Sequence, residues 1–262
     1  MDVVKIGGST LGQGDTTLAD LAALHGAGAR VVVVHGGGDA ITHWLSIHGV
    51  EAAFRRGLRV TDERALPVVV AVLAGLVNKE LVAALDAAGA RALGLSGADG
   101  GLIRAHHADP ELGYVGEIEA VDSAILRSLL QEGYLPVIAP LALGPGGTLL
   151  NINADTAAAA VAVSLEAQRL VFLTDVPGVI DGRGEVQARL TPAGAQALLD
   201  QGAISGGMVP KIEAALAAAR AGVETFIIDG RQPGALARLL AGTPLAKGPR
   251  PEPAGIMGTS IG

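Results

Sequence analysis

The sequence predicts an α/β protein, a three-layer α/β/α sandwich around a mainly parallel central sheet. Along its 262 residues, short apolar segments rich in valine, isoleucine and leucine alternate with longer segments of helical character. The apolar segments are continuous, which is typical of parallel strands that are buried on both faces. Because helices cover both faces of such a sheet, we expect three layers.

The first forty residues show the pattern. Residues 3–6 form a short apolar strand closed by a glycine pair at 7–8, and residues 17–25 form a helix. A second strand at 31–34 ends in three glycines at 36–38. Open parallel sheets bind ligands at the carboxyl ends of their strands, which is where both glycine clusters lie.

The same criteria predict the remaining elements in chain order. Helices are expected at residues 64–88, 122–132, 153–165, 191–201, 209–221 and 233–240, and strands at 90–95, 135–139, 170–173, 225–228 and 256–261. The composition does not shift sharply anywhere. We place a boundary near Gln168, which gives lobes 1–168 and 169–262 on one continuous sheet.

Composition and charge exclude several classes of protein. Half of the residues are hydrophobic and 17% are charged, which excludes a disordered chain. The formal net charge of −7 argues against a nucleic-acid partner, because phosphates select basic surfaces. The absence of cysteine excludes thiolate metal sites and cysteine nucleophiles.

The apolar runs predict no membrane partner. The longest, residues 65–77, contains Pro67 and stops at Asn78 and Lys79, short of the roughly 18 residues that span a bilayer. The N-terminus lacks the basic start, apolar middle and cleavage site of a signal peptide. We therefore expect a cytoplasmic protein without a transmembrane helix.

The two glycine-rich turns suggest phosphate binding but match neither common template. The dinucleotide pattern G-x-G-x-x-G fails because Ser9 and Ile41 stand where glycine is required. No Gly-Lys pair occurs, so there is no Walker A loop. The remaining interpretation is that backbone N–H groups of these turns cradle anionic oxygens.

Three basic residues lie close to glycine-rich segments. Lys5 interrupts a buried strand, where a charge needs an anion or a paired carboxylate. Lys211 lies in the first turn of a helix, where a cation opposes the helix dipole unless an anion is nearby. Arg59 is expected in a loop before the long helix, where its planar guanidinium could clamp a carboxylate. A strand-end lysine, an exposed first-turn lysine and a surface arginine are the structural alternatives.

The segment Asn151-Ile152-Asn153-Ala154-Asp155 opens an alanine-rich helix. Helix capping explains one asparagine and the aspartate, but explains the other asparagine poorly. The six histidines have no metal-ligand spacing such as H-E-x-x-H, so we expect no metal site made by the protein.

Taken in order, the motifs resemble the amino acid kinase family over nearly the whole chain. They are Lys5-Ile6-Gly7-Gly8, His35-Gly36-Gly37-Gly38, Gly57-Leu58-Arg59-Val60-Thr61-Asp62, Leu76-Val77-Asn78-Lys79, Gly94-Leu95-Ser96-Gly97, Asn151-Ile152-Asn153-Ala154-Asp155, Leu173-Thr174-Asp175-Val176-Pro177-Gly178, Gly206-Gly207-Met208-Val209-Pro210-Lys211 and Gly258-Thr259. The resemblance implies ATP-dependent phosphorylation of the γ-carboxylate of N-acetyl-L-glutamate, the second step of arginine biosynthesis.

The resemblance also implies roles for single residues. Lys5 and Lys211 would stabilise the transferring phosphoryl group, and Asp155 would orient both lysines. Acetylglutamate would be held by Gly37, Gly38, Arg59 and Asn151. The nucleotide would be held by Gly7, Gly8, Thr174, Asp175, Val176, Pro177, Gly178, Val179, Ala203, Ile204 and Ser205. Lobe 1–168 would then bind acetylglutamate and dimerise, and lobe 169–262 would bind ATP.

The implied chemistry suits these residues. A side-chain carboxylate with a pKa of about 4.3 is already ionised at neutral pH, so no general base is needed. Negative charge on the phosphoryl oxygens is the difficulty, and lysines with backbone N–H groups counter it. Mg²⁺ would arrive with ATP and be held mainly by phosphate oxygens and water.

Two other functions are alternatives. One is a kinase acting on carrier-protein-linked aminoadipate or glutamate in lysine biosynthesis, whose family departs from the motifs at 57–62 and 151–155. The other is a non-catalytic nucleotide-sensing scaffold, which would be expected to lose Lys5, Lys211 or Asp155.

The long apolar helix predicts the assembly. The apolar side chains of residues 66–85 lie on all sides of the helix, so the sheet can bury only some of them. A two-fold contact with a second copy of the chain would bury the rest. By the resemblance we expect a homodimer. Arginine-inhibited members carry an extra N-terminal helix, whereas the first strand here begins at once, so we expect no inhibition by that route.

Overall fold

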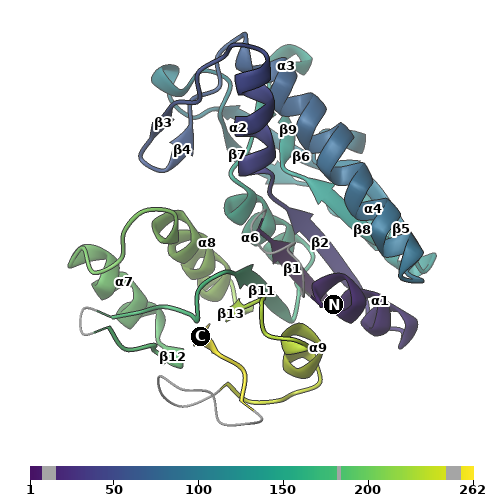
Figure 1. Cartoon of the computed structure of the whole chain (residues 1–262), viewed down its shortest axis with the longest axis vertical. Coiled ribbons are helices and arrows are strands. Elements are labelled where there is room, and N and C mark those ends of the chain that lie inside the picture. The colour runs from purple at the N-terminus through teal and green to yellow at the C-terminus, as the bar shows by residue number, and fades with distance from the viewer. Residues whose placement is uncertain (8–15, 182–183, 246–254) are drawn as a thin grey trace.

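The protein is built around an eight-stranded sheet, shown in the computed structural model of Figure 1, which describes residues 1–7, 16–181, 184–245 and 255–262. In order across the sheet the strands are β12 (Arg189–Leu190), β14 (Gly258–Ile261), β13 (Glu224–Asp229), β11 (Arg169–Thr174), β1 (Asp2–Ile6), β2 (Val31–His35), β8 (Leu135–Ala139) and β5 (Ala92–Ser96). All neighbours pair in parallel except β13 with β14. The predicted fold class is confirmed.

Helices cover both faces of this sheet. One face carries α1 (Thr17–Gly26), α4 (Asn78–Ala87) and α9 (Ala235–Leu240), and the other carries α5 (Ala124–Gln131), α6 (Ala154–Ser164) and α8 (Met208–Arg220), with α7 (Pro192–Asp200) beside α8. Every helix and strand expected from the sequence is present, with ends that differ by no more than two residues.

The period of two in β1 decides where Lys5 points. Val4 and Ile6 belong to the core on the α1, α4 and α9 side, and Val3 belongs to the core on the α5, α6 and α8 side. Lys5 therefore shares the side of Val3 and faces α6 and α8. The strand fixes which helices its ammonium group can reach.

A group of elements at one end of the sheet was not expected from the sequence. They are α2 (Gly38–Ile47), the hairpin β3 (Phe54–Arg55) with β4 (Leu58–Arg59), and a second sheet of β10 (Leu149–Asn151), β9 (Leu141–Leu143), β6 (Ile103–His107) and β7 (Gly116–Val121). Short 3₁₀ turns at Asp99–Gly101, Pro110–Leu112 and Pro145–Gly147 connect them. Arg59, expected in a loop, lies instead in β4.

The expected long helix forms, with a wider segment in its middle. It consists of α3 (Ala65–Val70), a π-helical segment η2 (Ala71–Val77) and α4, continuous from Ala65 to Ala87. The apolar run expected to end at Asn78 continues as helix for nine residues more, and an 18-residue window of the whole helix has a mean hydropathy of 2.0. By length and composition alone it could cross a membrane, a test that core helices of soluble proteins also pass.

The sheet crosses the expected lobe boundary without a break. Strand β1 pairs with β2 on one side and with β11, which begins at Arg169, on the other. The division at Gln168 stays a prediction.

Candidate active site

The candidate site lies at the carboxyl ends of β1 and β2, with the first turns of α6 and α8 close by. Because these strands are parallel neighbours, the turn after each reaches the same edge of the sheet. The turns are joined directly, since the backbone N–H of Gly36 donates to the carbonyl of Ile6 at 3.0 Å.

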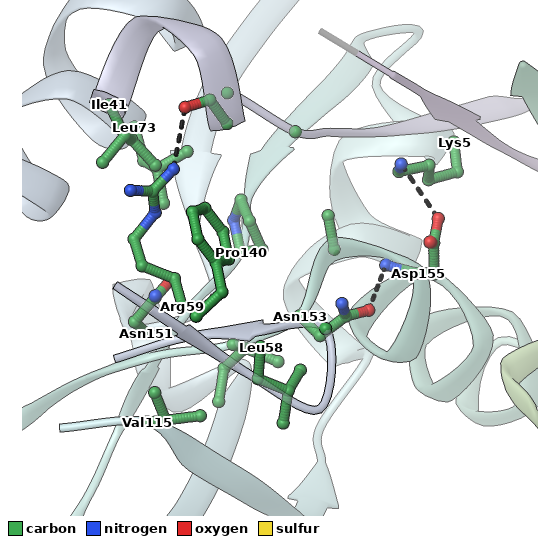
Figure 2. Close-up of a pocket in the computed structure, with 17 residues that line it drawn as sticks. Lys5, Ile41, Leu58, Arg59, Leu73, Val115, Pro140, Asn151, Asn153 and Asp155 are labelled. Carbon is green, nitrogen blue, oxygen red and sulfur yellow. Dashed lines mark hydrogen bonds and ion pairs between the residues drawn. The ribbon is translucent and has the colours of Figure 1, made fainter. Parts of the chain in front are cut away.

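Three charged residues from far apart in the sequence meet at this edge. Lys5 Nζ and Lys211 Nζ each lie 2.9 Å from the same oxygen, Oδ1 of Asp155, and Figure 2 shows the Lys5 contact. All three side chains are buried, with exposed fractions of 8%, 9% and 6% for Lys5, Lys211 and Asp155. The structure thus brings together the three residues that the sequence analysis singled out for phosphoryl transfer.

The electrostatics of this cluster favour an additional anion. Burial alone would raise the pKa of Asp155, but attraction to Lys5 and Lys211 outweighs it and holds the pKa below its ordinary value. For Lys211, burial and repulsion by Lys5 outweigh Asp155 and lower the pKa of the ammonium group. With one carboxylate facing two ammonium groups, the cluster has an excess positive charge that an anion would offset.

A cavity of about 220 Å³ opens beside the cluster, and we call it the Arg59 pocket. Its lining includes six residues that the sequence analysis assigned to the site: Lys5, Gly37, Gly38, Arg59, Asn151 and Asp155. Figure 2 shows Arg59 and Lys5 on opposite sides of this pocket, with Pro140 between them. The pocket therefore carries positive charge at two separate places.

The Arg59 guanidinium is held firmly but keeps one nitrogen unsatisfied. Its Nη2 donates to the Gly38 carbonyl at 2.9 Å and to Thr42 Oγ1 at 2.8 Å, and the group lies 4.7 Å from the centre of the Phe54 ring. Burial lowers its pKa, although nearby Asp39 acts in the opposite direction. Nη1 is buried without a hydrogen-bond partner among the described residues. Such an orphaned donor suits a carboxylate oxygen.

The two asparagines before α6 have different tasks. The side-chain oxygen of Asn153 accepts from the backbone N–H groups of Asp155 and Thr156, so Asn153 is the helix cap. Asn151 lines the pocket, and its Nδ2 donates to Thr61 Oγ1 at 3.0 Å. Asn151 thus has a place in the pocket wall, which accounts for the asparagine that capping did not explain.

A second cavity, of about 260 Å³, lies on the other side of the cluster and is called the Lys211 cleft here. It is lined by Lys5, Gly7, Gly38, Asp39, Asp155, Leu173, Thr174, Asp175, Gly207 and Lys211. Lys5, Gly38 and Asp155 line both cavities, so the two meet at the charged cluster.

Part of the expected nucleotide site stays outside both cavities. Neither is lined by Val176, Pro177, Gly178, Val179, Ala203, Ile204 or Ser205. Gly178 and Val179 pack against β14, where the Val179 N–H donates to Thr259 Oγ1 at 2.8 Å. Gly8 lies outside the described residues.

The structure adds Thr42 and Thr61, which the sequence analysis did not assign to the site. Thr42 holds Arg59, and fully buried Thr61 holds Asn151 while donating to the Arg59 carbonyl at 3.2 Å. Thr61 belongs to the motif at 57–62, but the role of each threonine depends on a partner that only folding brings close. Within the described ranges, no three His, Cys, Asp or Glu side chains are grouped as metal ligands.

Comparisons with known proteins agree with this geometry. A model of the amino acid kinase family matches residues 2–229. The chain is 50% identical over 240 residues to the acetylglutamate kinase of Rubrobacter xylanophilus, covering 92% of this chain and 93% of that protein. It is 46% identical over 239 residues to the acetylglutamate kinase of a Jannaschia species, covering 89% and 84%.

A solved structure also resembles the protein. N-acetylglutamate synthase from Neisseria gonorrhoeae, complexed with coenzyme A and N-acetyl-glutamate, superposes with a TM-score of 0.82 at 30% identity, covering 99% of this chain and 58% of that one. Because the family model spans most of the sequence and both curated relatives match along nearly all of it, the chain belongs to the amino acid kinase family.

Proposed function

We propose that the protein transfers the γ-phosphoryl group of ATP to the γ-carboxylate of N-acetyl-L-glutamate, giving N-acetylglutamyl 5-phosphate in the second step of arginine biosynthesis. The proposal rests mainly on the two positively charged groups at the Arg59 pocket. One is the Arg59 guanidinium with its unpaired Nη1, and the other is the Lys5–Asp155–Lys211 cluster. A dicarboxylate places one charge at each. The named activity of the two curated relatives supports this choice.

The acceptor is oriented by groups of different chemistry along the pocket. The α-carboxylate takes the free Nη1 of Arg59, and the γ-carboxylate lies at the Lys5 side. Asn151 Oδ1 accepts from the N–H of the acetamido group, since one N–H of the Asn151 amide bonds Thr61 and thereby orients the side chain. Ile41 and Leu73 supply apolar wall for the methylene chain. This arrangement selects a dicarboxylate whose nitrogen is acylated.

The phosphoryl step follows from the cluster. An oxygen of the γ-carboxylate attacks the γ-phosphorus of ATP, the bond from that phosphorus to the β–γ bridging oxygen breaks, and ADP leaves. Lys5 and Lys211 face the oxygens on which negative charge accumulates, and Asp155 holds both ammonium groups in place. No proton has to be removed from the nucleophile, so the lack of a general base is no obstacle.

ATP phosphates occupy the Lys211 cleft in this proposal. Gly7, Thr174 and Asp175 line this cleft, and Gly207 is the N-cap of α8, where backbone N–H groups suit a phosphate. We assign the adenosine part to residues 174–179 and 203–205 by family resemblance. Mg²⁺ fits as an ion held mainly by phosphate oxygens and water, since the described residues provide no carboxylate cage.

Acyl-phosphate formation tests the proposal. The enzyme is incubated with Mg-ATP and hydroxylamine, which traps acyl phosphates, using acetylglutamate, glutamate, aspartate and aminoadipate in parallel. We expect trapped product mainly from acetylglutamate. Product mainly from aminoadipate would favour the lysine-biosynthesis kinase, and no product from any acid would favour a nucleotide-sensing scaffold. Either result would refute the proposal.

Removing the proposed α-carboxylate and acetamido contacts should weaken acceptor binding. We expect Arg59→Ala and Asn151→Ala each to raise KM for acetylglutamate by about 10–100-fold while kcat changes little, because the lost hydrogen bonds act on the bound ground state. Steady-state kinetics measures both constants. Arg64→Ala is the matched control, since Arg64 is exposed and bonds the Gly49 carbonyl instead. Unchanged KM in both variants would place the acceptor elsewhere.

We also propose a homodimer formed through the long helix. Positions Pro67, Ala71 and Gly75 recur every four residues, are exposed and carry small side chains, which lets a second helix approach closely. Partly buried Leu66, Val70 and Leu76 flank them. We expect light scattering at micromolar concentration to give the mass of two chains, and Ala71→Arg to give one. Glu80→Arg, on the polar part of α4, should remain dimeric. A monomeric wild type would contradict this proposal.

A further inference from the structure

A fully buried histidine ends strand β2, next to the glycine turn of the Arg59 pocket. His35 has an exposed fraction of 1%, its Nδ1 lies 2.8 Å from the Gly36 carbonyl oxygen, and its Nε2 lies 3.1 Å from Asn78 Nδ2. A carbonyl oxygen only accepts, so Nδ1 carries the proton; an amide nitrogen donates, so Nε2 accepts. The contacts define a neutral ring with its proton on Nδ1, the tautomer that free histidine favours less.

The environment keeps this ring uncharged. Burial lowers the pKa of His35 to about 4. The Gly36 hydrogen bond acts in the opposite direction, whereas repulsion from Lys5 and Lys79 lowers the pKa further. At neutral pH the ring is therefore uncharged. Its contribution is to hold other groups in place.

Asn78 is the partner that fixes the histidine. It is fully buried where the π-helical segment η2 gives way to α4, and its Nδ2 also donates to the Val137 carbonyl at 2.9 Å. Its Oδ1 accepts from Lys79 Nζ at 2.9 Å, which sets the orientation of the amide. The helix is thereby tied to β2 and β8 through one side chain.

A glycine makes room for this amide. A Cβ at Gly94 would lie 2.0 Å from Asn78 Oδ1 and 2.8 Å from Lys79 Nζ, and Lys79 Nζ donates to the Gly94 carbonyl at 3.1 Å. Any larger residue at position 94 would therefore collide with the Asn78 amide. The network accounts for Asn78 and Lys79 of the motif at 76–79 and for Gly94 of the motif at 94–97, to which the phosphoryl-transfer proposal gives no task.

The network reaches the Arg59 pocket through one peptide group. In a trans peptide the Gly36 carbonyl and the Gly37 N–H point in opposite directions, so a carbonyl held by His35 turns the Gly37 N–H away from the ring. Gly37 lines the pocket, and in the described part of the chain its N–H has no bonded acceptor. Leu73 of η2 packs so closely on Gly37 that a Cβ there would lie 2.9 Å from Leu73 Cδ2.

We propose that His35 and Asn78 are positioning residues for the acceptor: by holding the Gly36 carbonyl, they keep the Gly37 N–H directed into the Arg59 pocket, where it binds a carboxylate or phosphoryl oxygen of the reaction proposed above. The network therefore preorganises a backbone donor, the kind of group that stabilises developing negative charge. Its kinetic consequence rests on the proposed function, whereas its structural part does not.

The tautomer of His35 tests the structural part. Long-range ¹H–¹⁵N correlation spectra of the full chain labelled with ¹⁵N-histidine, at neutral pH, report which ring nitrogen carries the proton. The His35 signals are those missing in His35→Gln. We expect Nδ1 protonation in the wild type and a shift toward Nε2 protonation in Asn78→Ala. A wild-type ring protonated on Nε2, or a charged ring, would overturn the network whether or not the protein phosphorylates acetylglutamate.

Kinetics tests the positioning role. We expect His35→Ala to lower kcat/KM for the acceptor about 10–100-fold with the KM for ATP unchanged, because a misdirected donor misplaces the acceptor. His35→Asn keeps a side-chain N–H close to the Nδ1 position and should recover part of the loss. His107→Ala is the matched control, since His107 Nδ1 makes the same kind of contact, to the Gly113 carbonyl at 3.0 Å, away from both cavities.

A near-isosteric change at Asn78 covers the case in which the alanine variant fails to fold. Asn78→Asp keeps the volume and the Lys79 contact but removes the N–H donors to His35 and Val137. It should lower kcat/KM for the acceptor as His35→Ala does. Full activity in Asn78→Asp, or an equal loss in His35→Asn and His35→Ala, would overturn the proposal. If the wild type prefers another acid, the same comparison is made with that acid.

Discussion

Lys5→Ala and Lys211→Ala should each lower kcat by about 10²–10³ while the KM values for ATP and acetylglutamate change little. Lys5 lines both the Arg59 pocket and the Lys211 cleft, and Lys211 lines the cleft, so both ammonium groups lie beside the path of the phosphoryl group between substrates in the proposed reaction. Interactions there strengthen as charge moves onto the phosphoryl oxygens, so their loss affects the transition state most. Steady-state kinetics with each substrate varied measures the effect.

Controls separate this effect from a general loss of structure. Arg220→Ala removes an exposed cation at the far end of α8 and should retain full activity. Lys211→Arg keeps the charge but replaces a compact ammonium group with a planar fork, so only part of the activity should return. Near-normal kcat in Lys5→Ala or Lys211→Ala would return that lysine to a structural role.

Asp155→Asn should lower the free energy of unfolding by about 3–5 kcal/mol at neutral pH, because two buried ammonium groups lose their counter-charge. Urea unfolding measures the difference from wild type, and Asp86→Asn, at an exposed position of α4, is the control. kcat should fall as well, since neither lysine is then held in place. A loss below about 1 kcal/mol would contradict the importance of the pairing.

The pH dependence of this difference has a definite sign. The pKa of Asp155 is lower in the folded chain than its ordinary value of 3.8, so its contribution is present above pH 3.8 and is lost as the pH falls through the folded value. The pKa of Lys211 is below 10.5 in the folded chain, so the cost of its charge disappears as the pH rises toward 10.5. The Asp155→Asn deficit should therefore be largest around neutral pH, shrink as the pH falls below 3.8 and shrink as the pH rises toward 10.5.

The main sheet and its helices were predictable because each element has a strong local pattern. The continuous apolar run of β2 predicts a buried strand, and the helical spacing of apolar residues in α5 predicts an amphipathic helix. Helix α2 was missed because it begins inside a glycine turn and buries only Ile41 and Leu45. Strand β7 alternates charged and apolar residues over a short span and takes its identity from its pairing with β6.

The candidate site was predictable from the order of its motifs more than from single residues. Lys5 and Asp155 are far apart in the sequence, and each taken alone has a sufficient structural explanation. They meet because the period of two in β1 turns Lys5 toward α6, whose first turn carries Asp155. The pairing of His35 with Asn78 has no local signal at all, since each side chain gains its meaning from the other.

The most direct measurement of the central claim is the identity of the carboxylate that receives the phosphoryl group. Acetylglutamate labelled with ¹⁸O in its γ-carboxylate is incubated with Mg-ATP and the enzyme, and the acyl phosphate is observed directly by ³¹P NMR. If Arg59 holds the α-carboxylate and the Lys5–Asp155–Lys211 cluster faces the γ-carboxylate, the bridging oxygen carries the label and the acyl-phosphate signal shows the upfield isotope shift. An unshifted acyl-phosphate signal, or ADP formed without any acyl phosphate, would contradict the account.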